Sequence, residues 1–228
     1  MAKEVIVISL GGSLIVPDEV DSDFLKSFRT LILRHLKNKR FVLITGGGKT
    51  CRKYIESAKN IVDVSQEDQD WLGIEVTKLN AHLVKTIFKK EAYPKVINNP
   101  TEKVSFKHKV LVASGWKPGC SSDFDAVLLA KNFKVKKIVN LSNIDMVYDK
   151  DPRKFSDAKP LKKISWKDYR KIIPKKWTPD LSTPFDPIAS KEAEKLKLEV
   201  VIMNGKKLGN LDNYLNNKSF VGTRIYSI

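Results

Sequence analysis

The chain has 228 residues, of which 42% are hydrophobic and 30% are charged, as in ordinary globular proteins. Its formal net charge is +16, carried mostly by lysine, which we interpret as a solvated surface; a nucleic-acid partner is the alternative. The cysteines, Cys51 and Cys120, form no C-x-x-C pair, so we expect a reducing, cytoplasmic location and no zinc site. Apolar runs of membrane-spanning length and a signal-peptide pattern are both absent, so no membrane association is expected.

The first part of the chain alternates between apolar runs and segments of helical periodicity. A buried strand is expected over residues 5–10, and a helix with apolar residues three and four apart begins at Asp21 or Ser22. A second strand is expected over residues 41–44, followed by a helix from about Lys49. A long helix is then expected over about 68–88, with an apolar face formed by Leu72, Val76, Leu79, Leu83 and Ile87.

The alternation continues in the second part. Short apolar strands are expected over residues 110–113, 138–141 and 200–203, and an edge strand over 220–226. The stretch 174–187 carries four prolines and is interpreted as a loop or flap. Apolar strands separated by helices predict a mostly parallel sheet that is covered on both faces, within a single domain spanning residues 1–228.

Two glycine-rich loops are the strongest functional signal. Gly46, Gly47 and Gly48 stand between a predicted strand and a predicted helix, where backbone N–H groups can bind a phosphate. Gly11-Gly12-Ser13 follows the first strand in the same way, which suggests a donor phosphate facing an acceptor phosphate. The loop of Gly46, Gly47 and Gly48 is not a Walker A motif, because Leu43 stands where that motif requires glycine. A tight turn without a ligand is the alternative for either loop.

Two further strand-to-helix segments carry polar groups. Residues 114–123 are small and hydroxylated and can hydrogen-bond a base or a sugar, although Ser122 or Asp123 could serve only as a helix cap. Residues 142–152 offer an aromatic ring, an amide and carboxylates, although Asp151-Pro152 alone is a turn signal.

In chain order these motifs are Gly-Gly-Ser, Gly-Gly-Gly-x-x-x-Arg-x-Tyr, Asp70-x-x-Gly73 before a helix bearing Asn80, Pro-Gly-x-Ser-Ser-Asp, and Asn-x-Asp-x-Val-Tyr-x-x-Asp-Pro. Together they resemble the archaeal-type uridylate (UMP) kinases of the amino-acid-kinase superfamily. The resemblance covers nearly the whole chain, including Asp186-Pro187 and Gly222-Thr223.

The resemblance implies an α/β fold, a three-layer sandwich around a mostly parallel central sheet, in which about residues 1–130 bind the acceptor and about 131–228 bind ATP. It implies transfer of the γ-phosphoryl group of ATP to UMP to give UDP in pyrimidine nucleotide biosynthesis, and a homohexamer. Mg²⁺ would be held mainly by the nucleotide phosphates rather than by protein side chains. A UMP phosphate is itself nucleophilic, so the reaction needs positioning and charge stabilisation rather than a strong base.

The resemblance also implies roles for individual residues. The expected catalytic residues are Gly48, Lys49, Arg52 and Asp123. The expected UMP-binding residues are Gly47, Asp70, Lys117, Pro118, Gly119, Cys120, Ser121, Ser122 and Asp123. The expected ATP-binding residues are Gly12, Ser13, Gly48, Arg52, Ser142, Asn143, Tyr148 and Asp151.

The sequence departs from the family pattern at a few positions. Ser9 replaces a lysine that much of the superfamily has, and Lys49 and Lys117 are the nearest candidates to supply the missing cation. Met146 and Ser114 replace glycines, and Asp125 adds a carboxylate where small residues are usual.

The departures leave alternatives open. One is another small-molecule kinase of the same fold. Isopentenyl phosphate kinases carry a histidine in the acceptor loop after the second glycine motif, and this chain has none there. The acid acceptor of acetylglutamate kinases does not call for the Asp70 contact. The other is a weakly active nucleotide- or nucleic-acid-binding homologue, which Ser9 and the basic charge motivate.

Overall fold

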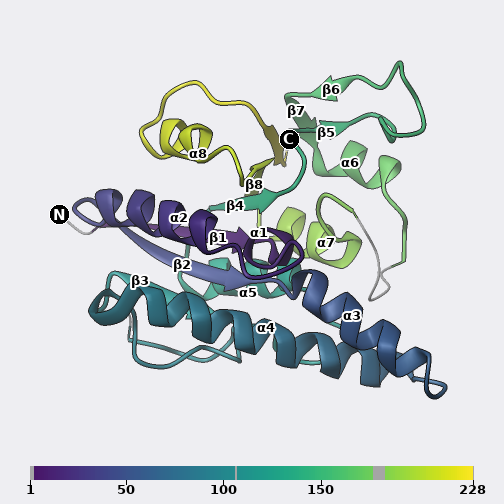
Figure 1. The fold of residues 1–228 in the computed structure, drawn as a ribbon. Coiled ribbons are helices and arrows are strands. Elements are labelled where there is room, and N and C mark those ends of the chain that lie inside the picture. Colours follow the sequence, from purple (N-terminus) through teal and green to yellow (C-terminus); the bar gives the residue numbers. More distant parts are fainter. Residues whose placement is uncertain (1–2, 106, 177–182, 228) are drawn as a thin grey trace.

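A computed structural model describes residues 3–105, 107–176 and 183–227 of the chain. Within these residues a seven-stranded sheet forms the centre, and Figure 1 shows it between layers of helices. In spatial order its strands are β3 (Val110–Ala113), β2 (Lys39–Thr45), β1 (Glu4–Leu10), β4 (Lys137–Ser142), β8 (Glu199–Asn204), β9 (Thr223–Tyr226) and β7 (Lys163–Ser165). The first five are parallel to one another, which confirms the predicted mostly parallel sheet.

Helices cover both faces of this sheet. One face carries α1 (Gly12–Ile15), α2 (Ser22–His35), α4 (Gln66–Phe88) and α8 (Leu208–Leu215). The other carries α5 (Ser122–Asn132), α6 (Trp166–Ile172) and α7 (Pro187–Lys195). The remaining elements are α3 (Gly48–Lys59), which packs on α4, a 3-10 turn η1 (Lys89–Glu91) and a hairpin of β5 (Val147–Tyr148) and β6 (Pro160–Leu161). The expected three-layer α/β sandwich is therefore confirmed.

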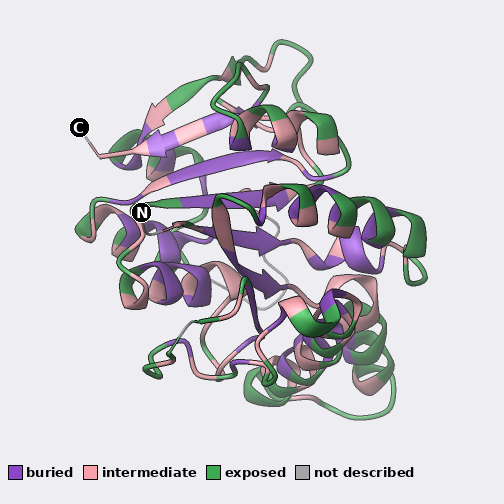
Figure 2. Ribbon diagram, turned by 90° about the vertical axis from the view of Figure 1, so that its left-hand side faces the viewer, coloured by how far each residue is buried: buried purple, intermediate pink, exposed green. Residues whose placement is uncertain are grey.

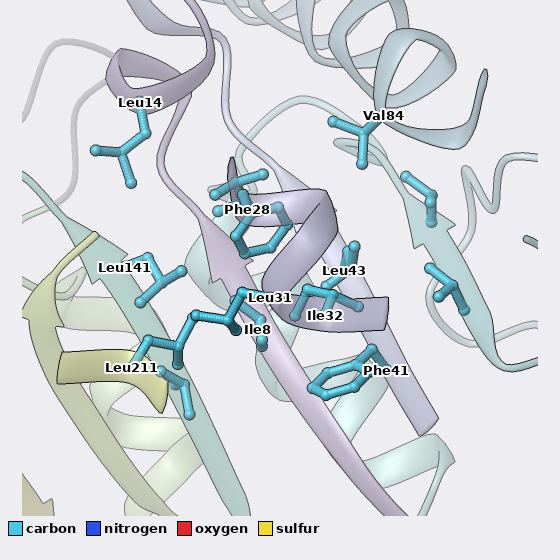
Figure 3. Close-up of a cluster of buried hydrophobic side chains, with 14 of the residues drawn as sticks. Ile8, Leu14, Phe28, Leu31, Ile32, Phe41, Leu43, Val84, Leu141 and Leu211 are labelled. Carbon is cyan, nitrogen blue, oxygen red and sulfur yellow. The ribbon is translucent and has the colours of Figure 1, made fainter. Parts of the chain in front are cut away.

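The core consists of two apolar clusters, one on each face of the sheet. Alternate residues of a strand point to opposite faces, so Ile8 of β1 joins the cluster under α2 whereas Val7 joins the cluster under α5. Figure 3 shows the first cluster, in which Phe28 and Ile32 of α2 lie against Ile8 and Leu43 of the sheet. Because both faces are buried, the strands read as continuous apolar runs, and Figure 2 shows the sheet buried between more exposed helices.

The second helix begins as the sequence predicts. Asp21 is its N-cap, and its side chain accepts a hydrogen bond from the Phe24 N–H at 2.9 Å, which satisfies one of the free amides of the first turn. The apolar positions three and four apart are buried, so this amphipathic prediction is confirmed. None of the described helices is both long and apolar enough to cross a membrane.

The predicted apolar face of α4 is wrong in part. Leu79, which the spacing placed on the buried face, has 65% of its surface exposed, and the buried residues centre instead on Thr77, Ala81, Val84 and Phe88. The helix is rotated relative to the prediction because a neighbouring row, also three and four residues apart, packs on the sheet. The row that faces inward includes the polar residues Thr77 and Asn80, and a purely apolar pattern therefore misses it.

The end of the sheet also differs from the prediction. β9 is not an edge strand: it lies between β8, to which it is antiparallel, and β7, to which it is parallel. β7 is the true edge, and its three residues are too few to show a pattern in the sequence. The predicted loop or flap at 174–187 lies partly outside the described residues; its last residue, Pro187, already belongs to α7.

Candidate active site

Two glycine loops lie in direct contact at the carboxyl ends of β1 and β2. The Gly46 N–H donates to the Leu10 carbonyl at 3.0 Å. A Cβ atom added to Gly12 would lie 2.0 Å from the Gly48 nitrogen, and one added to Gly48 would lie 2.4 Å from the Gly12 oxygen. Gly48 also has a φ of +69°, which favours glycine. The structure thus brings the two predicted phosphate loops together, backbone against backbone.

Asn80 of α4 sets the orientation of the second glycine loop. Its buried side chain donates from Nδ2 to the carbonyls of Gly46 at 2.8 Å and of Gly47 at 3.3 Å. In a trans peptide the C=O and N–H groups point in opposite directions. The N–H groups of Gly47 and Gly48 therefore point away from α4, on the side of the loop opposite to Asn80. This is the arrangement that an anion-binding loop requires.

The helix ends beside these loops offer fewer donors than the sequence predicts. α1 has only four residues, among them Ser13, so it contributes almost no helix dipole. The Lys49 N–H in the first turn of α3 donates to the Val16 carbonyl at 3.1 Å and is not available to a ligand. The amides open to an anion are therefore limited to the glycine loop, because the chain leaving α1 crosses the start of α3.

Two cations predicted for catalysis lie on α3. Arg52 is exposed, roughly one turn beyond the glycine loop, while the buried residue of this helix is Ile55. Lys49 forms an ion pair with Asp18, and this hydrogen bond lowers the pKa of the Asp18 carboxyl. Lys117 holds its ammonium group 4.2 Å from the centre of the Trp116 ring. Both candidates for the missing cation therefore have partners of their own, Lys49 in Asp18 and Lys117 in Trp116.

At the sequence position where much of the superfamily has lysine, this chain has Ser9, which forms a hydrogen bond to Asp123. Ser9 is buried, with 3% exposed, and its hydroxyl donates to the Asp123 carboxyl. Asp123 also accepts from the Asn140 Nδ2 at 3.3 Å and from the Asp186 N–H at 3.1 Å. The group keeps some solvent contact but is surrounded by protein atoms, and this burial, with the nearby charge of Asp186, raises its pKa to about 7. Within the part of the chain that the structure describes, no lysine or arginine is paired with the Asp123 carboxyl.

Asp186 extends this acidic cluster. Its Oδ1 caps α7 by accepting from the N–H groups of Ile188 at 2.5 Å and Ala189 at 3.0 Å. Its Oδ2 accepts from the Ser121 hydroxyl, which in turn accepts from the Phe124 N–H at 3.1 Å and so caps α5. Burial raises the pKa of Asp186. Two helix N-termini are therefore joined through one carboxylate, and Ser121 rather than Ser122 or Asp123 is the N-cap.

The loop of residues 114–121, called the 114–121 loop below, is held against α4. The Asp70 carboxylate accepts from the Gly119 N–H at 2.8 Å, and the Thr77 hydroxyl accepts from the Gly115 N–H at 2.8 Å. Burial raises the pKa of Asp70. The predicted UMP residue Asp70 therefore lies against the loop segment that carries the predicted UMP residues Lys117, Pro118 and Gly119. Cys120 is half-buried, and burial raises the pKa of its thiol to about 11, so it is a weak nucleophile.

The predicted ATP residues divide into two groups. Ser142 lies beside the first glycine loop, because the Gly11 N–H donates to the Leu141 carbonyl at 3.0 Å and a Cβ on Gly11 would lie 3.9 Å from the Ser142 Cα. The Ser142 hydroxyl donates to the amide oxygen of Asn143 at 3.4 Å. These two residues therefore share an edge of the sheet with Gly12.

Tyr148 and Asp151 lie in and just after β5, and neither makes a hydrogen bond to the glycine loops among the described residues. The Asp151 carboxylate accepts from Nε and Nη2 of Arg153, both at 3.0 Å, and these bonds lower its pKa. A ligand that used Asp151 would have to share it with Arg153.

Sequence reasoning gave no role to Thr77 or Asn140, and it named Asn80 only as part of a motif. All three donate or accept hydrogen bonds that fix the loops around the site. A signal for two of them is present, because Thr77 and Asn80 stand three residues apart on a long helix and are both buried. Asn140 stands inside an apolar strand, where a buried amide requires partners.

Known proteins resemble this chain in both sequence and fold. The family model for the amino acid kinase family matches residues 4–204. A uridylate kinase from Pyrococcus abyssi is 35% identical over 188 residues, covering 81% of this chain and 83% of the relative. One from Methanobrevibacter smithii is 32% identical over 225 residues, covering 97% and 99%. The crystal structure of a uridylate kinase from Archaeoglobus fulgidus superimposes with a TM-score of 0.82 at 30% identity, covering 97% of this chain and 99% of that one.

The chain therefore belongs to the amino acid kinase family. Within that family it groups with the archaeal uridylate kinases, and the resemblance drawn from the ordered motifs is confirmed.

Proposed function

We propose that this chain transfers the γ-phosphoryl group of ATP to UMP and releases UDP and ADP. The observation that carries the proposal is the contact between the two glycine loops, where Gly12 lies against Gly48. Phosphoryl transfer needs two phosphate groups held close together and in line, and backbone N–H groups from two adjoining loops are suited to hold them. The relatives named uridylate kinase support UMP as the acceptor.

The two halves of the molecule divide the substrates in this proposal. UMP lies on the side of Asp70 and the 114–121 loop, where a carboxylate can accept hydrogen bonds from the ribose hydroxyls. ATP lies on the side of Gly12, Ser142 and Asn143, toward β4 and β8. The acceptor side corresponds to about residues 1–130 and the donor side to about residues 131–228.

Charge stabilisation falls to few groups. Arg52 is exposed beside the glycine loops, and its planar fork suits two phosphate oxygens at once. Among the described residues no group of three metal-binding side chains lies close enough to hold a metal ion, so we assign Mg²⁺ to the nucleotide phosphates. Bound there, Mg²⁺ supplies positive charge to the transferred group. Asp123 is desolvated and has no lysine partner among residues 3–105, 107–176 and 183–227, and we assign it the role of orienting cations near that group.

The test is an ADP-release assay with ATP, Mg²⁺ and a panel of acceptors: UMP, CMP, AMP and small carboxylates. The proposal expects UMP to be the preferred acceptor, with UDP identified as the product by chromatography. Turnover confined to a non-nucleotide acceptor would refute UMP, and turnover of all three nucleotides at equal rates would refute a uridine-specific site.

We also propose that the chain assembles with copies of itself, as a hexamer in the arrangement implied by the resemblance. Large apolar side chains are exposed along α3, the turn after it and α4, namely Tyr54, Ile61, Val62, Trp71 and Leu79. Exposed apolar side chains gathered on neighbouring elements indicate a protein interface. Light scattering after size exclusion gives the mass in solution, and a monomer at micromolar concentration would refute assembly.

A further inference from the structure

Asp125 carries a carboxyl group that the fold buries completely and uses only in part. It lies in the first turn of α5, with 0% of its surface exposed. Its Oδ2 accepts from the Trp116 N–H at 3.2 Å, whereas its Oδ1 is buried without a hydrogen-bond partner among the described residues. A buried polar atom left without a partner costs about 1–3 kcal/mol, and more if it is charged. Packing alone therefore gives no reason for a carboxyl group at this position.

The helix does not need Asp125 as a cap either, because Ser121 already caps α5. The carbonyl oxygen of an asparagine in the same place would also accept the Trp116 N–H. What a carboxyl group adds to an amide is a charge that comes and goes with a proton. The function of Asp125 therefore depends on whether its carboxyl group is ionised.

Both positively and negatively charged groups face Asp125. Lys117 favours the carboxylate, while Asp186, ahead of α7, opposes it, and Asp123 precedes it on its own helix. Its charge in turn raises the pKa of Cys120 in the 114–121 loop. Desolvation is the largest effect and raises the pKa of Asp125 to about 7. At neutral pH the Asp125 side chain is therefore protonated in part of the molecules and ionised in the others.

The 114–121 loop is anchored at several points, and two of the anchors are carboxylates. Asp70 holds the Gly119 N–H, and Asp125 holds the Trp116 N–H. Lys117, which belongs to the predicted UMP contacts, lies between them. A hydrogen bond to an ionised acceptor is roughly twice as strong as one to a neutral acceptor. Loss of a proton from Asp125 therefore tightens the Trp116 end of the loop and attracts the Lys117 ammonium group.

We propose that Asp125 is a positioning residue, whose ionised carboxylate fixes the Trp116–Lys117 segment so that affinity for the acceptor nucleotide follows the charge of this side chain. This inference rests on the proposed function, in which the 114–121 loop holds the acceptor. Asp125 does not touch the reacting groups, so the rate of the chemical step is independent of it. Acceptor affinity rises with pH, since the ionised form is the one that holds the loop.

The test is calorimetric titration of UMP into the full-length protein without ATP, between pH 6 and pH 8, for the wild type and Asp125→Asn. If only the ionised form binds tightly, a group with a pKa of about 7 makes the wild-type Kd about tenfold lower at pH 8 than at pH 6. The second ionisation of the UMP phosphate, near pH 6, adds about twofold, equally in both proteins. In Asp125→Asn we expect only that twofold change.

Two control variants separate this role from a structural one. Asp23→Asn removes an acid from the first turn of α2, where it is exposed, and should leave the wild-type pH profile unchanged. Asp125→Ala removes the Trp116 bond as well as the charge, and should weaken UMP binding at every pH. In Asp125→Asn, kcat should match the wild type at pH 8 while KM for UMP rises about tenfold; a residue needed only for packing would change unfolding without changing this profile.

Parallel pH profiles for the wild type and Asp125→Asn would overturn the inference while leaving UMP phosphorylation intact. A fall in kcat with unchanged KM would overturn it too, because Asp125 would then act on the chemical step. Failure of the proposed function looks different: the acceptor panel would show another preferred monophosphate, and the same titration with that acceptor would still depend on Asp125.

Discussion

The contact between the glycine loops makes Gly12→Ala the sharpest test of the site. The added methyl group would lie 2.0 Å from the Gly48 nitrogen and 2.6 Å from the carbonyl carbons of Gly46 and Gly47. To reach an ordinary contact of 3.4 Å, the loops must separate by about 1.4 Å. All the nearest atoms are backbone, so no side chain can rotate away, and the whole loop must move.

The expected cost follows from that displacement. Misplacing reacting groups by about 1 Å lowers rates on the order of 100-fold, so kcat/KM for ATP and UMP should fall at least that far. Overpacking of this kind destabilises by about 1–3 kcal/mol. The ADP-release assay measures the first effect, and urea unfolding followed by circular dichroism measures the second.

Gly209→Ala is the matched control. Gly209 lies in α8, and a Cβ added there would meet no atom of the described residues within 4 Å. The same substitution in an open helix position should stabilise the fold by about 0.5–1 kcal/mol and leave activity unchanged. If Gly12→Ala kept activity within about threefold of Gly209→Ala, the close approach of the loops would have no part in the reaction, and the reasoning above would be refuted.

Three further predictions concern charged groups around the site. Arg52→Ala should lower kcat/KM about 100-fold or more without changing the urea midpoint, because Arg52 is exposed on α3; near-normal activity would remove its assigned role. Asp70→Asn should raise the Kd for UMP about tenfold and leave that for ATP unchanged, as titration of each ligand would show, since an amide still accepts the Gly119 N–H but binds ribose hydroxyls less strongly. The free energy of unfolding should fall as pH rises from about 4 to about 7, because folded Asp123 keeps a proton that the unfolded chain has already released near 3.8. Urea titrations measure the difference in unfolding free energy between pH 5 and pH 8, and Asp123→Asn should reduce this difference by an amount on the order of a few kcal/mol. An unchanged difference would show that Asp123 is ionised in the folded protein.

Much of the fold follows from local pattern. The strand over Val110–Ala113 coincides with the apolar run that predicts it, and Asp21 caps α2 as its position indicates. Buried strands and capped helices are recognisable because a few adjacent residues determine them. The prediction failed for α4, where a polar pair takes part in the buried face and exposes Leu79 instead.

The sequence indicated the candidate site residues but not the hydrogen bonds that join them. Glycine loops after apolar strands indicate phosphate binding, and Asp70 and the 114–121 loop were both expected to bind the acceptor. That Asp70 holds the loop itself, through the Gly119 N–H, is a contact between residues far apart in the chain. The same holds for Asn80 and the carbonyls of Gly46 and Gly47, which give the glycine loop its orientation.

The sequence by itself therefore indicated the class of fold, the two glycine loops that we predict to bind phosphate, and the family. Strands and glycine loops are encoded in short runs of neighbouring residues, and the family is encoded in the order of the motifs along the chain. Only the tertiary structure decided that the two glycine loops touch and that the Ser9 hydroxyl donates to Asp123 where a lysine is usual. It also decided that Asp125 is buried, with one oxygen that has no hydrogen-bond partner in the described part of the chain. The physical reason is that desolvation and hydrogen bonding depend on which distant segments the sheet brings together.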